Sequence, residues 1–352
     1  MRSACAVSLP SLTVSRIDHL TADAAALTFD VPAELAPVFA FSPGQWLTVC
    51  RGGERRSYSI CTPLGQAPRI GVREVPGGAL STWLVRQVRP GDVIDVLPPA
   101  GTFTPDLRKP GDHVLLAAGS GITPILSIAA SVLAAHETSS VTLLYGNRRA
   151  DTVMFAEEIA DLKDAYPTRM RVVHVFSREH HEVELFCGRL DAPKLRSLLP
   201  ALVDVPAIDH WWVCGPLAMT VDAATVLGEL GVPRERVHRE LFYVGDEPPP
   251  PRNREVPEVG AEVTIVLDGR TSTVTVPPGV PILDGAQRIR PDLPFACKGG
   301  VCGTCRAKVV DGQVSMKRNY ALEPAELDAG YVLTCQSLAA TDRVTVDYDA
   351  RL

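Results

Sequence analysis

Four of the nine cysteines have a spacing that suits iron–sulfur chemistry. Cys297, Cys302 and Cys305 form a C-x4-C-x2-C run, and Cys335 follows after a long gap. Four thiolates with this spacing can hold a 2Fe–2S cluster. Glycines between the cysteines let the loop curl tightly and turn its amides toward sulfur. A structural zinc site also uses four cysteines, but usually as two C-x2-C-like pairs, so the pattern favours the cluster.

A second set of residues suits a phosphorylated cofactor with a flat ring. Arg56 can hold a pyrophosphate, Tyr58 can cover a conjugated ring, and Ser59 can approach its reactive edge. A Gly-Gly turn then leads into Ser81 and Thr82, where the start of a helix offers unpaired amides to phosphate. An exposed strand can carry R-x-Y-S by chance, so the combination is what indicates a flavin site.

A third set suits a dinucleotide. The run 119–124, GSGITP, follows a predicted strand and opens a predicted helix. Its glycines let the backbone approach a pyrophosphate, and Thr123 before Pro124 begins the helix whose N-terminus faces that group. Cys214 ends a later strand, at the edge where open α/β sheets bind ligands. The alternative is that Cys214 is simply a small, buried residue that packs as an apolar side chain.

The elements that position these sets change in kind along the chain. Residues 1–106 carry six short β-type runs between Gly/Pro turns, which predicts an antiparallel β-barrel or sandwich. Residues 107–243 alternate strands with helices, which predicts a doubly wound parallel α/β sheet. Four consecutive prolines make 244–260 an extended linker. Residues 261–352 open with a hairpin at Asp268-Gly269, typical of a type I′ turn, and form a small β-rich domain.

The composition excludes several partner classes. The 352 residues are 46% hydrophobic and 22% charged, with a net charge of −6 and no long basic run. We therefore expect neither nucleic acid nor an anionic membrane as the main partner. No stretch has the roughly 18 apolar residues of a membrane span, and the first ten residues show no export signal. A cytoplasmic location follows, where thiols stay reduced and disulfides are not expected.

Residues 10–243 resemble the ferredoxin–NADP reductase superfamily, and residues 261–352 resemble plant-type ferredoxins, which implies a C-terminal α+β, β-grasp-like domain. The first resemblance implies FAD in the barrel domain, with Arg56 at its pyrophosphate, Tyr58 on the isoalloxazine or ribityl group, and Ser59 near N5. The implied cofactor-binding residues of the barrel are Arg56, Tyr58, Ser59, Val72, Gly78, Leu80, Ser81 and Thr82.

The same resemblance also implies which residues bind the nicotinamide nucleotide. It implies that Cys214 lies beside the nicotinamide during hydride transfer and that Glu240 lies near the flavin, so Ser59, Cys214 and Glu240 are the candidate catalytic residues. A Ser-Arg pair at the third strand commonly binds the 2′-phosphate, which favours NADPH over NADH, with solvated surface arginines as the alternative. The implied nucleotide-binding residues are Gly119, Thr123, Pro124, Arg148, Ser177, Arg178, Cys214, Gly215 and Pro216.

The chain resembles the reductase subunits of ring-1,2-phenylacetyl-CoA epoxidases over essentially its whole length. The resemblance is most evident in the segments 292–306, 319–324 and 330–336. That family implies a path from NADPH through FAD and the cluster to a di-iron oxygenase. A hydride carries two electrons whereas the cluster accepts one, so a flavin must stand between them. Relatives serve other oxygenases, including steroid hydroxylases. The alternatives are a phthalate dioxygenase type of reductase with FMN and NADH, and a non-enzymatic redox sensor.

Overall fold

The computed structural model describes residues 9–180, 182–242, 260–295, 298–322 and 324–350. These residues fall into two compact units, one made of 9–54 with 58–242 and the other of 260–350 with the short segment 55–57. The predicted proline-rich linker lies outside the described residues apart from Gly260. The domain boundaries proposed from sequence stay predictions.

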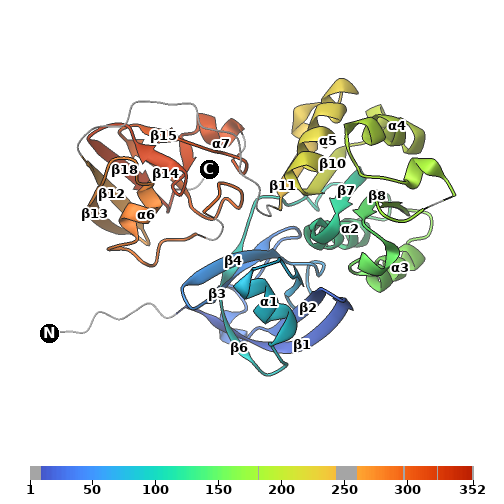
Figure 1. Cartoon of the computed structure of the whole chain (residues 1–352), viewed down its shortest axis with the longest axis horizontal. Helices are drawn as coiled ribbons and strands as arrows, with labels where there is room; N and C mark the ends of the chain where they lie inside the picture. The colour runs from blue at the N-terminus through green and yellow to red at the C-terminus, as the bar shows by residue number, and fades with distance from the viewer. Residues whose placement is uncertain (1–8, 181, 243–259, 296–297, 323, 351–352) are drawn as a thin grey trace. The chain divides into compact units, whose positions relative to one another are not determined.

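The first half of the first unit is an antiparallel sheet of six strands that curves toward closure (Figure 1). Its order is β4-β3-β6-β1-β2-β5. An antiparallel bridge between Ile60 and Ile70 joins the two edges of the sheet, as a barrel requires. Helix α1 (Ala79–Arg86) buries Leu80 and Leu84 in the core that the strands surround. The strands are β1 (Ser11–Thr21), β2 (Ala24–Asp30), β3 (Trp46–Arg51), β4 (Glu54–Ser59), β5 (Arg69–Arg73) and β6 (Val93–Ala100).

The second half of this unit is a five-stranded parallel sheet with helices on both faces (Figure 1). The order is β11-β10-β7-β8-β9. Along β7, Leu115 and Ala117 pack in one core with α2 and α3, whereas Val114 and Leu116 pack in another with α4 and α5. Burial on both faces explains the nearly continuous apolar strands. The elements are β7 (Asp112–Ala118), α2 (Ile122–Ala135), β8 (Ser140–Asn147), α3 (Ala156–Ala165), β9 (Met170–Phe176), α4 (Ala192–Leu202), β10 (His210–Gly215), α5 (Leu217–Glu229) and β11 (Val237–Leu241).

This strand order has a switch point between β7 and β10. From β7 the chain moves outward to β8 and β9, then crosses back to place β10 on the other side of β7. Connections therefore leave the carboxyl ends of β7 and β10 in opposite directions and open a crevice there, the usual ligand site of such sheets. The Gly-rich run and Cys214 lie at these two strand ends, as the sequence predicts.

The second unit is a mixed five-stranded sheet of order β13-β12-β18-β14-β16, with a separate β15–β17 pair. Strands β12 and β18 are parallel. The predicted hairpin turn is confirmed: Asp268 and Gly269 have φ values of +54° and +66°, as a type I′ turn needs. Their amides both donate to the Asp349 carboxylate, at 2.8 Å each. The elements are β12 (Ala261–Leu267), β13 (Arg270–Val276), α6 (Ile282–Ala286), β14 (Arg306–Asp311), β15 (Val314–Met316), α7 (Pro324–Asp328), β16 (Tyr331–Leu333), β17 (Ser337–Ala339) and β18 (Arg343–Asp347).

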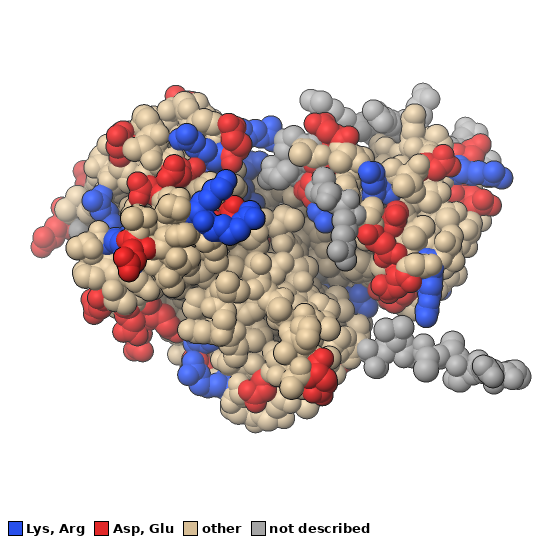
Figure 2. All heavy atoms as spheres, turned by 180° about the vertical axis from the view of Figure 1, so that it is seen from behind, with Lys and Arg blue, Asp and Glu red and all other residues tan. Residues whose placement is uncertain are grey.

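The face of the molecule seen in Figure 2 is not dominated by one sign of charge. On this face, acidic and basic side chains are interspersed over a largely uncharged surface. Within the described ranges, no helix is both long enough and apolar enough to span a membrane.

Candidate functional site

The Gly-rich loop after β7 lies directly against the end of β10. Gly119 has a φ of +55°, and a Cβ placed on Gly121 would lie 2.2 Å from the carbonyl oxygen of Cys214. A side chain at Gly121 would therefore force the loop away from β10. The Thr123 hydroxyl donates to the carbonyl of Ser120 at 3.0 Å, which holds the first turn of α2. The N-terminus of α2 thus faces the crevice at the switch point, where it suits a phosphate group.

Ser59, Cys214 and Glu240, the three predicted catalytic residues, meet at one place. The Ser59 hydroxyl donates to Glu240 Oε2 at 3.3 Å, and the Cys214 Sγ lies 4.0 Å from the same oxygen. Burial raises the pKa of Glu240 to about 8, against a smaller lowering by the Ser59 hydrogen bond. Burial also raises the pKa of the Cys214 thiol well above its usual range. At neutral pH the site therefore holds a protonated carboxyl group beside a neutral thiol.

The predicted flavin-binding residues differ in how exposed their side chains are. Tyr58 is half-buried against the barrel core, and the exposed Arg56 donates to the carbonyl of Arg55 at 2.7 Å. Val72 and Leu80, by contrast, are buried in the barrel core. Any contact of these two with a cofactor must therefore come from main-chain atoms.

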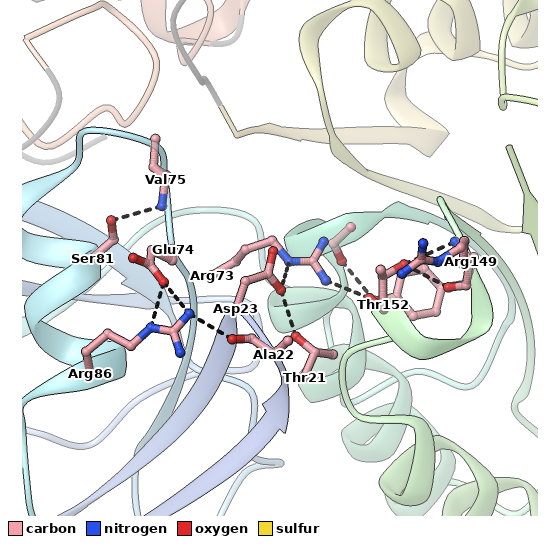
Figure 3. Close-up of polar contacts among 12 residues, drawn as sticks. Thr21, Ala22, Asp23, Arg73, Glu74, Val75, Ser81, Arg86, Arg149 and Thr152 are labelled. Atoms are coloured by element: carbon pink, nitrogen blue, oxygen red, sulfur yellow. Dashed lines mark hydrogen bonds and ion pairs between the residues drawn. The ribbon is translucent and has the colours of Figure 1, made fainter. Parts of the chain in front are cut away.

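Hydroxyl groups from the first turn of α1 hold the shape of the turn that precedes it (Figure 3). The Ser81 hydroxyl accepts from the Val75 amide at 3.1 Å and donates to the Gly78 carbonyl at 3.2 Å. The Thr82 hydroxyl donates to Glu74 at 3.2 Å. Gly78, the residue before α1, has no side chain to cap the helix, so the amides of the first turn are what this site can offer to phosphate.

The predicted 2′-phosphate residues come together at the ends of β8 and β9. The amide of Arg178 donates to the carbonyl of Arg148 at 2.9 Å, and the amide of Ser177 donates to Asn147 at the same distance. Arg148 and Arg178 are exposed, and in the described chain neither forms an ion pair. Arg149 is already paired, at 2.6 Å, with Asp151 (Figure 3). Two available guanidinium groups therefore share one edge of the sheet.

Arg73 is a candidate that the sequence motifs do not reveal. It ends β5, donates to the carbonyl of Thr152 at 2.6 Å and lies 3.5 Å from the Asp23 carboxylate (Figure 3). Its Nη1 is 3.1 Å from where a Cβ on Gly119 would be. The Arg73 guanidinium group is thus held beside the Gly-rich loop after β7. The only signal in the sequence is an arginine next to Val72 in a predicted flavin-binding strand.

Of the predicted cluster cysteines, Cys302 and Cys305 lie in the loop before β14, and Cys335 follows β16. Cys305 and Cys335 are buried, Cys302 is half-buried, and Cys297 lies outside the described residues. The pKa of the Cys305 thiol is raised well above its usual range, first by a hydrogen bond with Cys335 and then by burial, so these two sulfur atoms are neighbours.

The backbone of this loop is tightly curled. Lys298, Gly300 and Gly303 have φ values of +51°, +81° and +67°. Among the described residues, no three His, Cys, Asp or Glu side chains are placed to hold a metal ion, and the seven described cysteines form no disulfide. Soft thiol donors around a glycine-rich loop fit an iron–sulfur cluster.

Family models match three separate parts of the chain. Models described as an oxidoreductase FAD-binding domain, an oxidoreductase NAD-binding domain and a 2Fe-2S iron-sulfur cluster binding domain match residues 11–104, 115–225 and 265–340. The last match supports the iron–sulfur interpretation over zinc. The structure of phthalate dioxygenase reductase has a TM-score of 0.60 and 22% identity, covering 96% of this chain and 98% of that chain, which confirms the predicted fold class.

Two relatives are similar from end to end. The E subunit of 1,2-phenylacetyl-CoA epoxidase from Escherichia coli (strain K12) is 42% identical over 349 residues, covering 97% of this chain and 98% of that protein. The ferredoxin reductase component of 3-ketosteroid-9-alpha-monooxygenase from Rhodococcus rhodochrous is 34% identical over 352 residues, covering 96% of each. These relatives favour an enzyme over a redox sensor. The chain is thus an NAD(P)H-dependent oxidoreductase and belongs to the family of oxygenase reductase components that join FAD-binding, NAD-binding and 2Fe–2S domains.

Proposed function

We propose that this protein passes electrons from NADPH to a di-iron oxygenase that epoxidises phenylacetyl-CoA. The observation that carries this proposal is the 42% identity to the E subunit of 1,2-phenylacetyl-CoA epoxidase, which extends over 97% of the chain. NADPH and free thiols both belong to the cytoplasm, so we propose that the protein acts there.

The residues at the crevice suggest how the nucleotide is held. Arg73 and the N-terminus of α2 would share the pyrophosphate, because both lie at the Gly119–Gly121 loop. Arg148 and Arg178, with Ser177, would bind the 2′-phosphate. The lack of an ion pair for either arginine in the described chain supports NADPH over NADH, since an anion can take both guanidinium groups without displacing a carboxylate.

Ser59, Cys214 and Glu240 suggest how the reacting rings of the flavin and the nicotinamide are held. Bound FAD would take two electrons as a hydride and release them singly. The Ser59 hydroxyl, fixed by Glu240, would hydrogen-bond near the reactive edge of the ring, and the protonated carboxyl of Glu240 would keep negative charge away from it. The neutral thiol of Cys214 would pack on the nicotinamide and exclude water. Cys297, Cys302, Cys305 and Cys335 would hold the cluster.

The test uses the purified protein with its cofactors. The released flavin is identified by chromatography, and the iron and zinc contents are measured. Anaerobic reduction with NADPH and with NADH is then followed by stopped-flow absorbance. FAD, two irons per chain and a higher kcat/KM for NADPH are expected. FMN with a preference for NADH would instead indicate a reductase of the phthalate dioxygenase type.

The partner is tested by reconstitution. The protein, NADPH and a purified di-iron phenylacetyl-CoA epoxidase component should convert phenylacetyl-CoA to its epoxide. A second reaction replaces that component with the oxygenase of a 3-ketosteroid 9α-hydroxylating system and its steroid substrate. Turnover in the second reaction alone would overturn the proposed partner but not the electron path.

A further inference from the structure

Gln336 connects the two segments that carry the cluster cysteines. Its side-chain Nε2 donates to the carbonyl of Lys298 at 2.7 Å and to the carbonyl of Cys335 at 3.0 Å. Lys298 belongs to the loop that contains Cys302, whereas Cys335 follows β16. One amide group therefore joins parts of the chain that are 38 residues apart.

The same amide also lies beside a cysteine sulfur. Gln336 Nε2 is 3.8 Å from the Sγ of Cys335. Because a side-chain amide has two N–H groups, the one that donates to the Cys335 carbonyl is shared with the sulfur of the same residue. The side chain is buried, with 9% of the residue exposed. A donor that is shielded from water beside a sulfur atom has a stronger electrostatic effect than one in solvent.

The surroundings of Gln336 fix where its amide points. The backbone N–H of Gln336 donates to the Leu333 carbonyl at 2.8 Å, and the backbone carbonyl of Gln336 accepts from the backbone N–H of Lys317 at 2.7 Å. A Cβ placed on Gly300 would lie 3.0 Å from Gln336 Cγ. Gly300 thus leaves the space that the glutamine fills, and both the backbone and the side chain of Gln336 are held in place.

We propose that Gln336 is a positioning residue for the 2Fe–2S cluster. It holds the loop of Cys302 against Cys335 and directs an N–H toward the Cys335 sulfur, which raises the reduction potential. The reason is that reduction adds negative charge to the cluster and its sulfur ligands, and a hydrogen-bond donor stabilises that charge. This inference rests on the proposed role of Cys335 as a ligand.

The test compares Gln336→Met, which keeps the length of the side chain but removes the donor, with wild type. Gln287→Met is the matched control, because Gln287 accepts a hydrogen bond from the Lys298 side chain at 2.8 Å and, among the described residues, bonds to no cysteine. The potential of each loaded protein is measured by a redox titration followed by electron paramagnetic resonance, which does not depend on activity.

We expect Gln336→Met to lower the equilibrium constant for cluster reduction at least threefold, about 28 mV at 59 mV per tenfold for one electron. Gln287→Met should change it much less. An unchanged potential in a fully loaded Gln336→Met protein would overturn the inference, whereas a wild-type protein without the cluster signal would instead overturn the proposed function.

A measurement on the unchanged protein covers the case in which Gln336→Met fails to fold. Wild type is produced with 15N in glutamine side chains, and nitrogen couplings to the reduced cluster are recorded by pulsed electron paramagnetic resonance. A coupling from a side-chain amide that is absent in Gln336→Glu supports the inference. No such coupling in the labelled wild type contradicts it.

Discussion

The hydroxyl of Ser59, at the end of β4, donates a hydrogen bond to the carboxyl of Glu240 on β11, 181 residues further along the chain. This contact joins the barrel to the last strand of the parallel sheet. Because Cys214 of the neighbouring strand approaches the same carboxyl oxygen, one group organises the region where the two cofactors are proposed to meet.

Glu240→Gln should remove a pH dependence near 8. In wild type, burial raises the pKa of Glu240 to about 8, so ionisation above this value places a negative charge beside a ring that accepts a hydride. We expect flavin reduction by NADPH to slow roughly tenfold, ~1.4 kcal/mol in the barrier, as the pH rises through that value. Stopped-flow rates from pH 6 to 10 should show the inflection in wild type only. The same inflection in Glu240→Gln would assign it to another group.

Arg178→Ala should reduce the preference for NADPH. Loss of a charge-assisted hydrogen bond to the 2′-phosphate costs about 1.5–3 kcal/mol, so kcat/KM for NADPH should fall roughly tenfold or more while that for NADH stays nearly constant. Arg149→Ala is the control, because Arg149 is already paired with Asp151. Equal losses for both nucleotides would contradict a role at the 2′-phosphate.

Gly121→Ala should damage the dinucleotide site. The added Cβ would lie 2.2 Å from the Cys214 carbonyl and 2.9 Å from the Gly215 amide nitrogen, and backbone atoms cannot move aside as a flexible side chain can. We expect a loss of about 2–3 kcal/mol in unfolding free energy and weaker NADPH binding by titration. Gly228→Ala, in α5 with open space around the new atom, should instead gain about 0.5 kcal/mol.

Three histidines near the amino ends of β7, β10 and β11 predict a loss of stability in acid. Nδ1 of His113 accepts from the Trp212 indole at 3.1 Å, and the ring of His238 stacks on Trp212. Burial first, and then the nearby His210, lower the pKa of His113 and of His238 to about 4 each. Both are therefore neutral in the folded protein at pH 6.

In the unfolded chain these histidines take up protons near pH 6.5, so stability falls as the pH drops from about 6.5 to about 4. For His113 alone the effect is on the order of 3 kcal/mol. Urea titrations followed by tryptophan fluorescence should show a flatter pH dependence for His113→Gln, whose carbonyl can still accept from Trp212. Glu240 acts in the opposite direction. Because its pKa is raised in the folded protein, the protein loses stability as the pH rises from 4.5 to about 8. The effect of the histidine is therefore taken from the difference between His113→Gln and wild type. Parallel curves would contradict the prediction.

Cys335→Ser should abolish or strongly reduce the cluster while NADPH still reduces the flavin, because the two cofactors lie in separate domains. Iron content, visible absorbance and the signal after dithionite measure the loss. Cys187→Ser, outside the C-x4-C-x2-C pattern, should keep a full cluster. Normal iron in Cys335→Ser would remove this residue from the ligand set.

The periodic parts of the fold could be predicted from the sequence. Strands buried on both faces, such as β7, read as apolar runs between turns, and the Asp268-Gly269 turn requires residues that tolerate positive φ. The start of α3 is not evident from local preference, because Phe155 adopts a φ of +59° and the helix begins only at Ala156. Packing against Gly71 fixes Phe155, and local preference gives no sign of this contact.

The site was predictable where the motifs are local. The Gly-rich loop, the strand end with Cys214 and the C-x4-C-x2-C run each lie in one short segment. By contrast, Arg73 beside Gly119 and Gln336 on Lys298 depend on contacts between distant segments, which a single sequence does not reveal. The sequence also does not reveal that His113, His210 and His238 lie together, because these histidines come from three different strands.

The position of β18 has a consequence for biosynthesis. This strand, Arg343–Asp347, lies between β12 and β14 in the middle of its sheet, although the ribosome makes it after every other strand of the module. The sheet of the second unit therefore stays incomplete until Asp347 has been added, and we expect stable insertion of the cluster only after that point. A stop codon just before Arg343 would remove the central strand and leave a flavoprotein without a terminal electron carrier.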